Sequence, residues 1–137
     1  MGELNYGFKK KLQTKSFEEA KEQVRAALKD EGFGVLTEID MQAKMKEKLN
    51  VDFQKYVILG ACNPPLAHQA LETESHLGLL LPCNVVLQET KNGDVEVSFV
   101  DPKALFTVVD DPETAPAAEE AFKSLSAAFQ KLQSKAV

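Results

Sequence analysis

Two strand-like runs joined by Asn92-Gly93 constrain the fold of this chain more than any other feature. Residues 84–91 and 95–100 each have the composition of a β-strand, and Asn-Gly is the dipeptide best suited to the type I′ turn of a hairpin. Such a turn leaves its two strands side by side and antiparallel. The sequence therefore predicts an antiparallel sheet that contains at least this pair of strands.

Further strands are predicted before the hairpin. Residues 6–13 alternate, with Tyr6, Phe8 and Leu12 on one side and Lys10 out of pattern, which indicates a half-buried first strand. A second strand is expected over residues 33–39. The run 56–61 has no polar face, which is typical of a strand buried on both sides or lying in the middle of a sheet.

A capping box marks the start of a long amphipathic helix. Ser16 is expected to accept a hydrogen bond from an amide of the first turn, while Glu19 reaches back to the amide of Ser16. Gly32 supplies the left-handed residue that ends the helix. Apolar residues at three- and four-residue steps predict a second long helix near the C-terminus, with the stripe Phe122, Leu125, Phe129 and Leu132.

Shorter helices are predicted between these elements. Asp40 caps a helix that extends to Leu49, and its apolar face of Met41, Met45 and Leu49 is expected to pack in the core. Asn63 caps the next helix, with two prolines in the first turn, where a missing amide is best tolerated. A helical turn begins at Asp101-Pro102, and residues 110–116 are expected to form a polar linker.

These elements predict an α+β fold in which two long helices cover one face of an antiparallel sheet, with short connecting helices. The length of 137 residues suits one domain, residues 1–137, with one core. The other face of the sheet then needs cover from the short helices or from a partner. We therefore expect a homodimer.

Charge and hydropathy exclude some functional classes. The net charge of −5 argues against nucleic acid as a partner, because duplex binders concentrate positive charge. Lys9-Lys10-Lys11 is basic, but a strand sends these side chains to alternate faces, which favours a solubilising edge strand. No apolar run approaches the ~20 residues that span a bilayer, and the first residues lack the layout of a secretory signal. We expect a cytoplasmic protein with reduced thiols and no membrane partner.

The two cysteines of the chain are each followed directly by asparagine, in Cys62-Asn63 and Cys83-Asn84. Because Cys62 precedes a helix cap, its sulfur is expected near several free amides and the positive end of a helix dipole. Such a position lowers the pKa of a thiol and favours the reactive thiolate. The competing interpretation is a buried cysteine that ends a core strand, since free cysteine is among the most buried residue types. Cys83 is equally open to both interpretations.

The leading functional hypothesis is a small dimeric ligand-binding or sensor-like module. Its pocket is expected to be framed by Cys62, Asn63, Cys83 and Asn84. The asparagine amides supply donors and acceptors together, and the amides at the helix start favour an anionic ligand or a thiolate. The sequence names no cofactor.

Two alternatives use the same cysteines. A redox protein or thiol enzyme would use Cys62 as nucleophile and Cys83 as resolving partner, with His68 or His76 as base. A soft-metal protein would bind zinc or copper(I) with these cysteines and histidines, provided that the fold brings Cys83 beside the helix start. His68 and Glu72 lie four residues apart on one helical face, where an exposed pair is the competing interpretation.

Nearly the whole chain resembles a known family, and the specific motif lies in its central third. The resemblance rests on Leu59-Gly60-Ala61-Cys62-Asn63-Pro64 and on Gly78-Leu79-Leu80-Leu81-Pro82-Cys83-Asn84-Val85-Val86, with Ala67 and Ala70-Leu71 between them. These segments are similar to the prokaryotic family numbered 302 among domains of unknown function. The resemblance implies a TBP-like α+β fold, a curved antiparallel sheet with two helices on one face, and dimerisation. It implies no activity.

Overall fold

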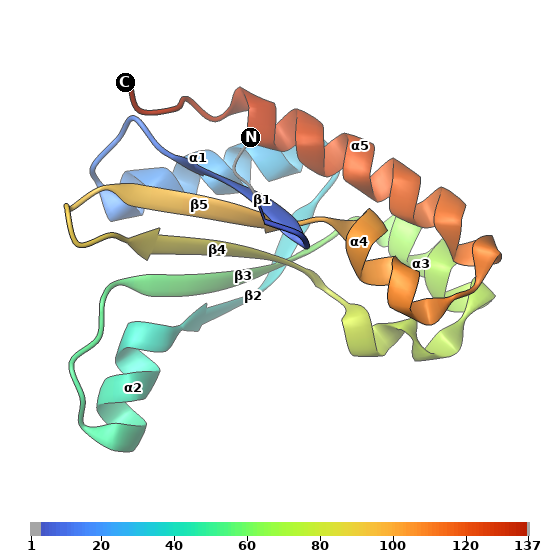
Figure 1. Ribbon diagram of the computed structural model, residues 1–137, viewed down its shortest axis with the longest axis horizontal. Coiled ribbons are helices and arrows are strands. Elements are labelled where there is room, and N and C mark those ends of the chain that lie inside the picture. The colour runs from blue at the N-terminus through green and yellow to red at the C-terminus, as the bar shows by residue number, and fades with distance from the viewer. Residues whose placement is uncertain (1–3, 137) are drawn as a thin grey trace.

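A five-stranded antiparallel sheet organises the chain in the computed structural model, which describes residues 4–136 (Figure 1). The strands are β1 (Gly7–Lys11), β2 (Gly34–Asp40), β3 (Tyr56–Cys62), β4 (Cys83–Glu89) and β5 (Val95–Val100). Their spatial order is β1-β5-β4-β3-β2, and every neighbouring pair is antiparallel. The α-helices are α1 (Phe17–Asp30), α2 (Met41–Leu49), α3 (Pro64–Thr73), α4 (Pro102–Phe106) and α5 (Ala115–Lys131), and the 3-10 helices are η1 (Ser75–Leu80), η2 (Thr107–Val109) and η3 (Pro112–Thr114).

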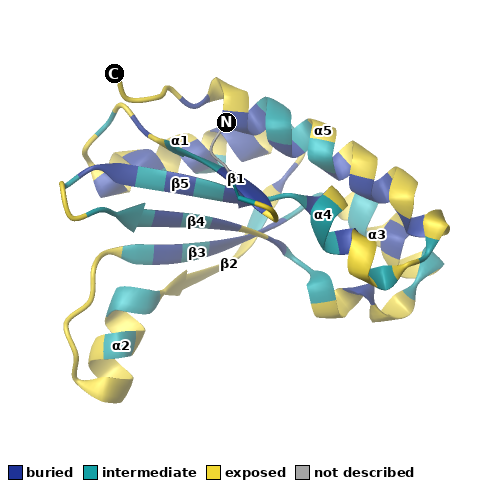
Figure 2. Ribbon diagram, viewed as in Figure 1, coloured by how far each residue is buried: buried dark blue, intermediate teal, exposed yellow. Residues whose placement is uncertain are grey.

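The two long helices, α1 and α5, lie on the same face of this sheet, as the sequence predicts (Figure 1). The strand side chains that face them are buried, among them Leu59, Val85, Leu87, Val97 and Phe99. The dark blue residues of Figure 2 gather between the helices and the sheet. The α+β class and the antiparallel sheet are therefore confirmed, and the arrangement agrees with a TBP-like fold.

The β4–β5 hairpin is confirmed, but its turn is not the predicted type I′. A type I′ turn needs positive φ at both central residues, whereas here Gly93 has φ 81° and Asn92 is not among the residues with positive φ. The Gly93 amide donates to the Thr90 carbonyl at 2.9 Å, and the Thr90 amide donates to the Asp94 carbonyl at 2.8 Å. This is the three-residue loop in which a glycine follows a turn and forms a bulge.

Strand β3 does not have the predicted double-sided burial. Val57, Leu59 and Ala61 are buried against the helices, whereas Tyr56 and Ile58 on the other face are half-buried. The middle strand of the sheet is β4, and β3 lies between it and the edge strand β2. The half-buried residues of β3 lie on the face away from α1 and α5, the side on which α2 projects.

Helix α1 begins with half of the predicted capping box. The Ser16 hydroxyl accepts from the Glu19 amide at 3.2 Å, but the Glu19 carboxylate does not accept from the Ser16 amide. The Thr14 hydroxyl accepts from the Ser16 amide instead, and the Glu19 carboxylate accepts from the side chain of Gln23. Gly32, with φ 85°, follows the helix as predicted.

Helix α2 begins at Asp40 as predicted, since the Asp40 carboxylate accepts from the Ala43 amide at 2.9 Å. The expected packing of its apolar face in the core is wrong. Met41 and Met45 are only half-buried and Leu49 is 65% exposed, because α2 projects away from the sheet on the side opposite α1 and α5 (Figures 1 and 2).

The C-terminal region also differs from the prediction. The expected linker over residues 110–116 contains η3 and the first residues of α5. After α5 the chain runs back along β1, where the Gln13 amide donates to the Gln133 carbonyl and the Lys135 amide donates to the Lys11 carbonyl. No described helix is long and apolar enough to cross a membrane.

Candidate functional site

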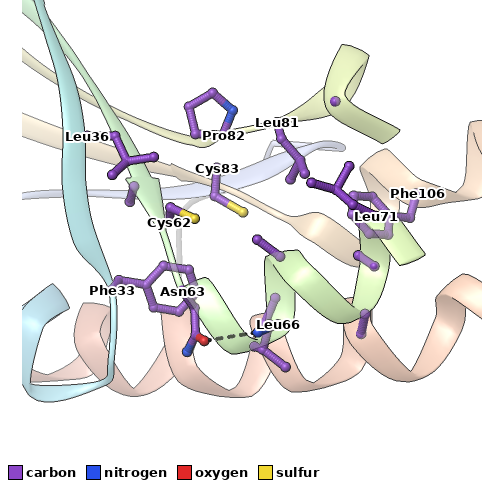
Figure 3. Close-up of a pocket in the computed structure, with 16 residues that line it drawn as sticks. Phe33, Leu36, Cys62, Asn63, Leu66, Leu71, Leu81, Pro82, Cys83 and Phe106 are labelled. Atoms are coloured by element: carbon purple, nitrogen blue, oxygen red, sulfur yellow. Dashed lines mark hydrogen bonds between the residues drawn. The ribbon is translucent and has the colours of Figure 1, made fainter. Parts of the chain in front are cut away.

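A pocket of about 280 Å³ opens where β3 ends and β4 begins, beside helix α3 (Figure 3). Its walls come from β2, β3, α3, the approach to β4, α4 and α5. Cys62, Asn63 and Cys83 all line it, and no charged side chain does. The fold therefore brings three of the four predicted site residues together around one apolar cavity.

The strand register brings the two cysteines to neighbouring positions. Cys83 is the first residue of β4 and pairs across the sheet with Ala61, the residue before Cys62. Figure 3 shows side chains of both cysteines at the pocket wall. Both are free thiols, with Cys62 half-buried and Cys83 buried. The chain between them, formed by α3 and η1, lines part of the pocket.

Asn63 and Asn84 have different positions. The Asn63 Oδ1 atom accepts from the Leu66 amide at 3.2 Å, so this side chain is the N-cap of α3, as predicted. Asn84 follows Cys83 on the strand, and its side chain therefore points to the opposite face, where it is exposed. The structure does not place Asn84 in the pocket, because strand alternation separates it from Cys83.

The start of α3 has no free amide to offer. Pro64 and Pro65 occupy its first two positions and carry no N–H group. The Leu66 amide donates to the Asn63 side chain, and the Ala67 amide donates to the Asn63 carbonyl at 2.9 Å. The expectation of several free amides near Cys62 is therefore wrong.

Both thiols have raised pKa values, which agrees with the buried-cysteine interpretation and not with the reactive thiolate. Burial raises the pKa of Cys62. Burial, and to a smaller extent the charge of Cys62, raise the pKa of Cys83 from its usual value of 9.0 to about 11. Loss of solvation disfavours the thiolate, and the capped helix start supplies no compensating donor. At neutral pH both cysteines are protonated.

The two histidines lie outside the pocket. His68 pairs with Glu72 at 3.2 Å and His76 with Glu74 at 2.9 Å, and both imidazoles are largely exposed. Within residues 4–136, no group of three or more His, Cys, Asp or Glu residues is arranged to hold a metal ion. The structure thus does not assemble the Cys/His cluster on which the metal alternative depends, nor does it bring either imidazole to the pocket as a base.

Several pocket residues were not identified from the sequence. Phe33, Leu36 and Phe106 line the cavity together with Ala117 and Ala121 of α5. A shift in the β2–β3 register between Val35 and Thr37 adds Leu36 as an extra residue, and Leu36 is 67% exposed. The two alanines lie one helical turn apart, a spacing that was visible in the sequence and lets α3 approach α5 closely.

Comparison with known proteins agrees with this fold. The family model described as "Domain of unknown function DUF302" matches residues 8–132. An uncharacterized conserved DUF302 protein from Bacillus stearothermophilus has a similar crystal structure, with a TM-score of 0.85 and 30% sequence identity. The match covers 93% of this chain and 98% of the other. No curated protein matches the sequence.

Proposed function

The chain belongs to the DUF302 family, and we propose that it is a homodimeric, one-domain protein that binds a small molecule in the pocket of Cys62, Asn63 and Cys83. The observation that carries this proposal is the cavity itself. It is concave, apolar and formed by segments distant in the sequence, which are the usual properties of a ligand site. Asn84 has no part in it.

Filling the cavity tests this proposal. Ala67 of α3 lines the pocket and is half-buried, so Ala67→Phe should occupy the space with little strain elsewhere. We expect the neutral fluorescent probe N-phenyl-1-naphthylamine to bind the unmodified protein at least about tenfold more tightly than the Ala67→Phe protein. Ala127→Phe, a half-buried α5 position outside the pocket, is the matched control and should bind like the unmodified protein. Equal binding by all three proteins would exclude this pocket as the site.

Thiol chemistry is the second candidate, because Cys62 and Cys83 line the same cavity. The raised pKa values argue against it. We expect a disulfide reagent such as dithionitrobenzoate to modify both cysteines more slowly at pH 7.5 than it modifies free cysteine. Faster modification of Cys62 than of free cysteine would instead favour a thiol enzyme.

The open face of the sheet supports the dimer part of the proposal. Ile39, Ile58 and Val86 are successive partners across β2, β3 and β4, and they form an apolar row on the face that lacks α1 and α5. Ile39 is 41% exposed, and the other two are half-buried in the protomer. A second copy would remove this row from water.

Free cysteines agree with the proposed cytoplasmic location.

Light scattering tests the dimer. The protein should have a mass about twice 15.1 kDa at micromolar concentration. Val86→Lys places a charge in the apolar row and should give the protomer mass, with unchanged circular dichroism as evidence of folding. Gln130→Lys, on the exposed side of α5, is the control and should remain a dimer. A protomer mass for the unmodified protein would contradict this part of the proposal.

A further inference from the structure

We propose that the ligand of this pocket is an uncharged, hydrocarbon-like molecule and that the site discriminates against anions and cations. This inference rests on the proposed function, since it names the ligand class of the same cavity. The inferred ligand class differs from the anionic ligand that the sequence pattern favours. Three independent features of the pocket support it.

The first feature is the absence of a counter-charge. Among residues 4–136, those that line the cavity include no Lys, Arg, Asp, Glu or His. An ion that entered would lose its hydration without gaining a partner of opposite charge, which opposes its binding. The two thiols do not supply a negative charge for a cation, since both are protonated at neutral pH.

The second feature is the occupied start of α3. A helix N-terminus attracts anions through its unbonded amides and its dipole. Here Pro64 and Pro65 remove two amides, and Asn63 accepts from the next two through its side chain and its carbonyl. The Asn63 Nδ2 atom lies toward Gly32, 3.0 Å from the position that a Cβ would take there. The Oδ1 atom of this polar residue is thus engaged with the protein, and its Nδ2 atom is turned toward Gly32.

The third feature is the shape and composition of the walls. Figure 3 shows the ring of Phe33 at one end of the pocket and the ring of Phe106 at the other. Leucines and alanines line the space between them, and Leu36 and Leu71 are partly exposed at its edge. A volume of about 280 Å³ is nearly twice the roughly 150 Å³ of an engineered cavity that holds benzene. We therefore infer a ligand of about ten carbon atoms, scaling from that cavity.

A matched set of probes tests the ligand class on the full chain. 1-Octanol, octanoate and octylammonium share one chain length and differ in charge. Each is titrated against the bound N-phenyl-1-naphthylamine at pH 7.5, where the second is an anion and the third a cation. We expect 1-octanol to displace the fluorescent probe at a concentration at least about tenfold lower than either ion. Ala67→Phe should remove most of the bound probe that 1-octanol can displace, and Ala127→Phe should preserve it.

A charge introduced at the rim gives a second readout. Leu71 lines the pocket and is 38% exposed, so Leu71→Lys places an ammonium group at the edge without burying it fully. The preference should then shift toward octanoate by about tenfold or more relative to 1-octanol. Leu79→Lys is the control, because Leu79 is 87% exposed and lies outside the pocket lining. It should leave the preference unchanged.

The failures of the two proposals are distinguishable. If octanoate competes as well as 1-octanol in the unmodified protein, and Ala67→Phe abolishes both, the pocket binds ligands but the inferred class is wrong. If Ala67→Phe changes the binding of none of the probes, the proposed function fails and the ligand class fails with it. An equal effect of Leu71→Lys and Leu79→Lys would also overturn the inferred class, because the preference would then not originate in the pocket.

Discussion

The ammonium group of Lys10 lies 4.2 Å from the centre of the Phe129 ring and donates a 2.8 Å hydrogen bond to the carbonyl of the same residue. A second hydrogen bond, of 2.9 Å, joins it to the carbonyl of Leu132. Carbonyls at a helix C-terminus have no partner within the helix and carry the negative end of its dipole. Lys10 of the edge strand β1 therefore closes the C-terminal end of α5.

Removal of this ammonium group should destabilise the protein. Lys10→Met keeps most of the aliphatic stem but removes the two hydrogen bonds and the contact of the cation with the ring. We expect a loss of about 1 to 2 kcal/mol in the free energy of unfolding, measured by urea denaturation. Lys9→Met, one residue earlier and on the opposite face of the sheet, is the control. Equal midpoints for the two variants would show that the cap contributes nothing.

Lys10 also illustrates which parts of the fold the sequence predicts. Caps at Ser16, Asp40 and Asn63 depend on residues within one helical turn, and all three occur where the local pattern indicates. The alternating pattern of the first strand fails at Lys10 because its partner is 119 residues away along the chain. No local pattern contains that information.

The candidate site likewise has features that the sequence predicts and features that it does not. Cys62 and Cys83 come together because β3 and β4 are adjacent and antiparallel, so that β3 ends where β4 begins. The position of Leu36 depends on a shift in strand register, for which the sequence gives no recognisable signal. The lack of free amides at the start of α3 can be predicted from the sequence, since Pro64 and Pro65 have no N–H group to donate.

Gly60 should not tolerate a side chain. A Cβ on Gly60 would collide with the Thr37 hydroxyl oxygen and would lie 2.7 Å from Cγ of Pro82. We expect Gly60→Ala to lower the free energy of unfolding by about 1 to 3 kcal/mol through overpacking beside the pocket. Gly34→Ala, in the neighbouring strand, is the control, because nothing lies within 4 Å of the added Cβ. Thermal melts in which both variants resemble the unmodified protein would contradict this prediction.

Asp94 should hold the C-terminal tail. Its buried carboxylate accepts two hydrogen bonds of 3.0 Å from the ammonium group of Lys135. Asp94→Asn removes the charge that holds Lys135. The two amides that join the residues after α5 to the residues around β1, those of Gln13 and Lys135, should then exchange with deuterium several-fold faster. Asp52→Asn, at an exposed ion pair, is the control and should leave that exchange unchanged. Unchanged exchange in Asp94→Asn would show that the backbone pairing alone holds the tail.

The same ion pair predicts an acid dependence. The hydrogen bond from Lys135, together with the charges of Lys135, Lys15 and Lys11, holds the pKa of Asp94 below its usual value. A group whose pKa is lowered by folding contributes stability above its unfolded pKa and loses it as the pH falls through its folded pKa. Exchange of the Lys135 amide, corrected for its intrinsic pH dependence, should therefore accelerate only below the usual pKa of an aspartate. Acceleration already near neutral pH would contradict the assignment to Asp94.

The stability that the buried thiol of Cys83 contributes should be lost in alkaline solution. The pKa of this thiol is raised by folding from 9.0 to about 11, so between these values the unfolded chain loses a proton that the folded chain keeps. The contribution of Cys83 is complete below pH 9.0 and is lost as the pH rises through about 11. A shift of this size corresponds to about 2 to 3 kcal/mol, at 1.36 kcal/mol for each pKa unit.

Urea denaturation at a series of pH values measures this effect by comparison with Cys83→Ala. The variant is expected to be less stable near neutral pH, because it leaves a small cavity in the core. Other groups titrate in both proteins, so the difference between the two proteins isolates Cys83. This difference should remain constant up to about pH 8 and shrink steadily above pH 9.0. A constant difference throughout would show that the thiol ionises as easily in the folded protein as in the unfolded one, and the argument that burial keeps the pocket uncharged would then fail.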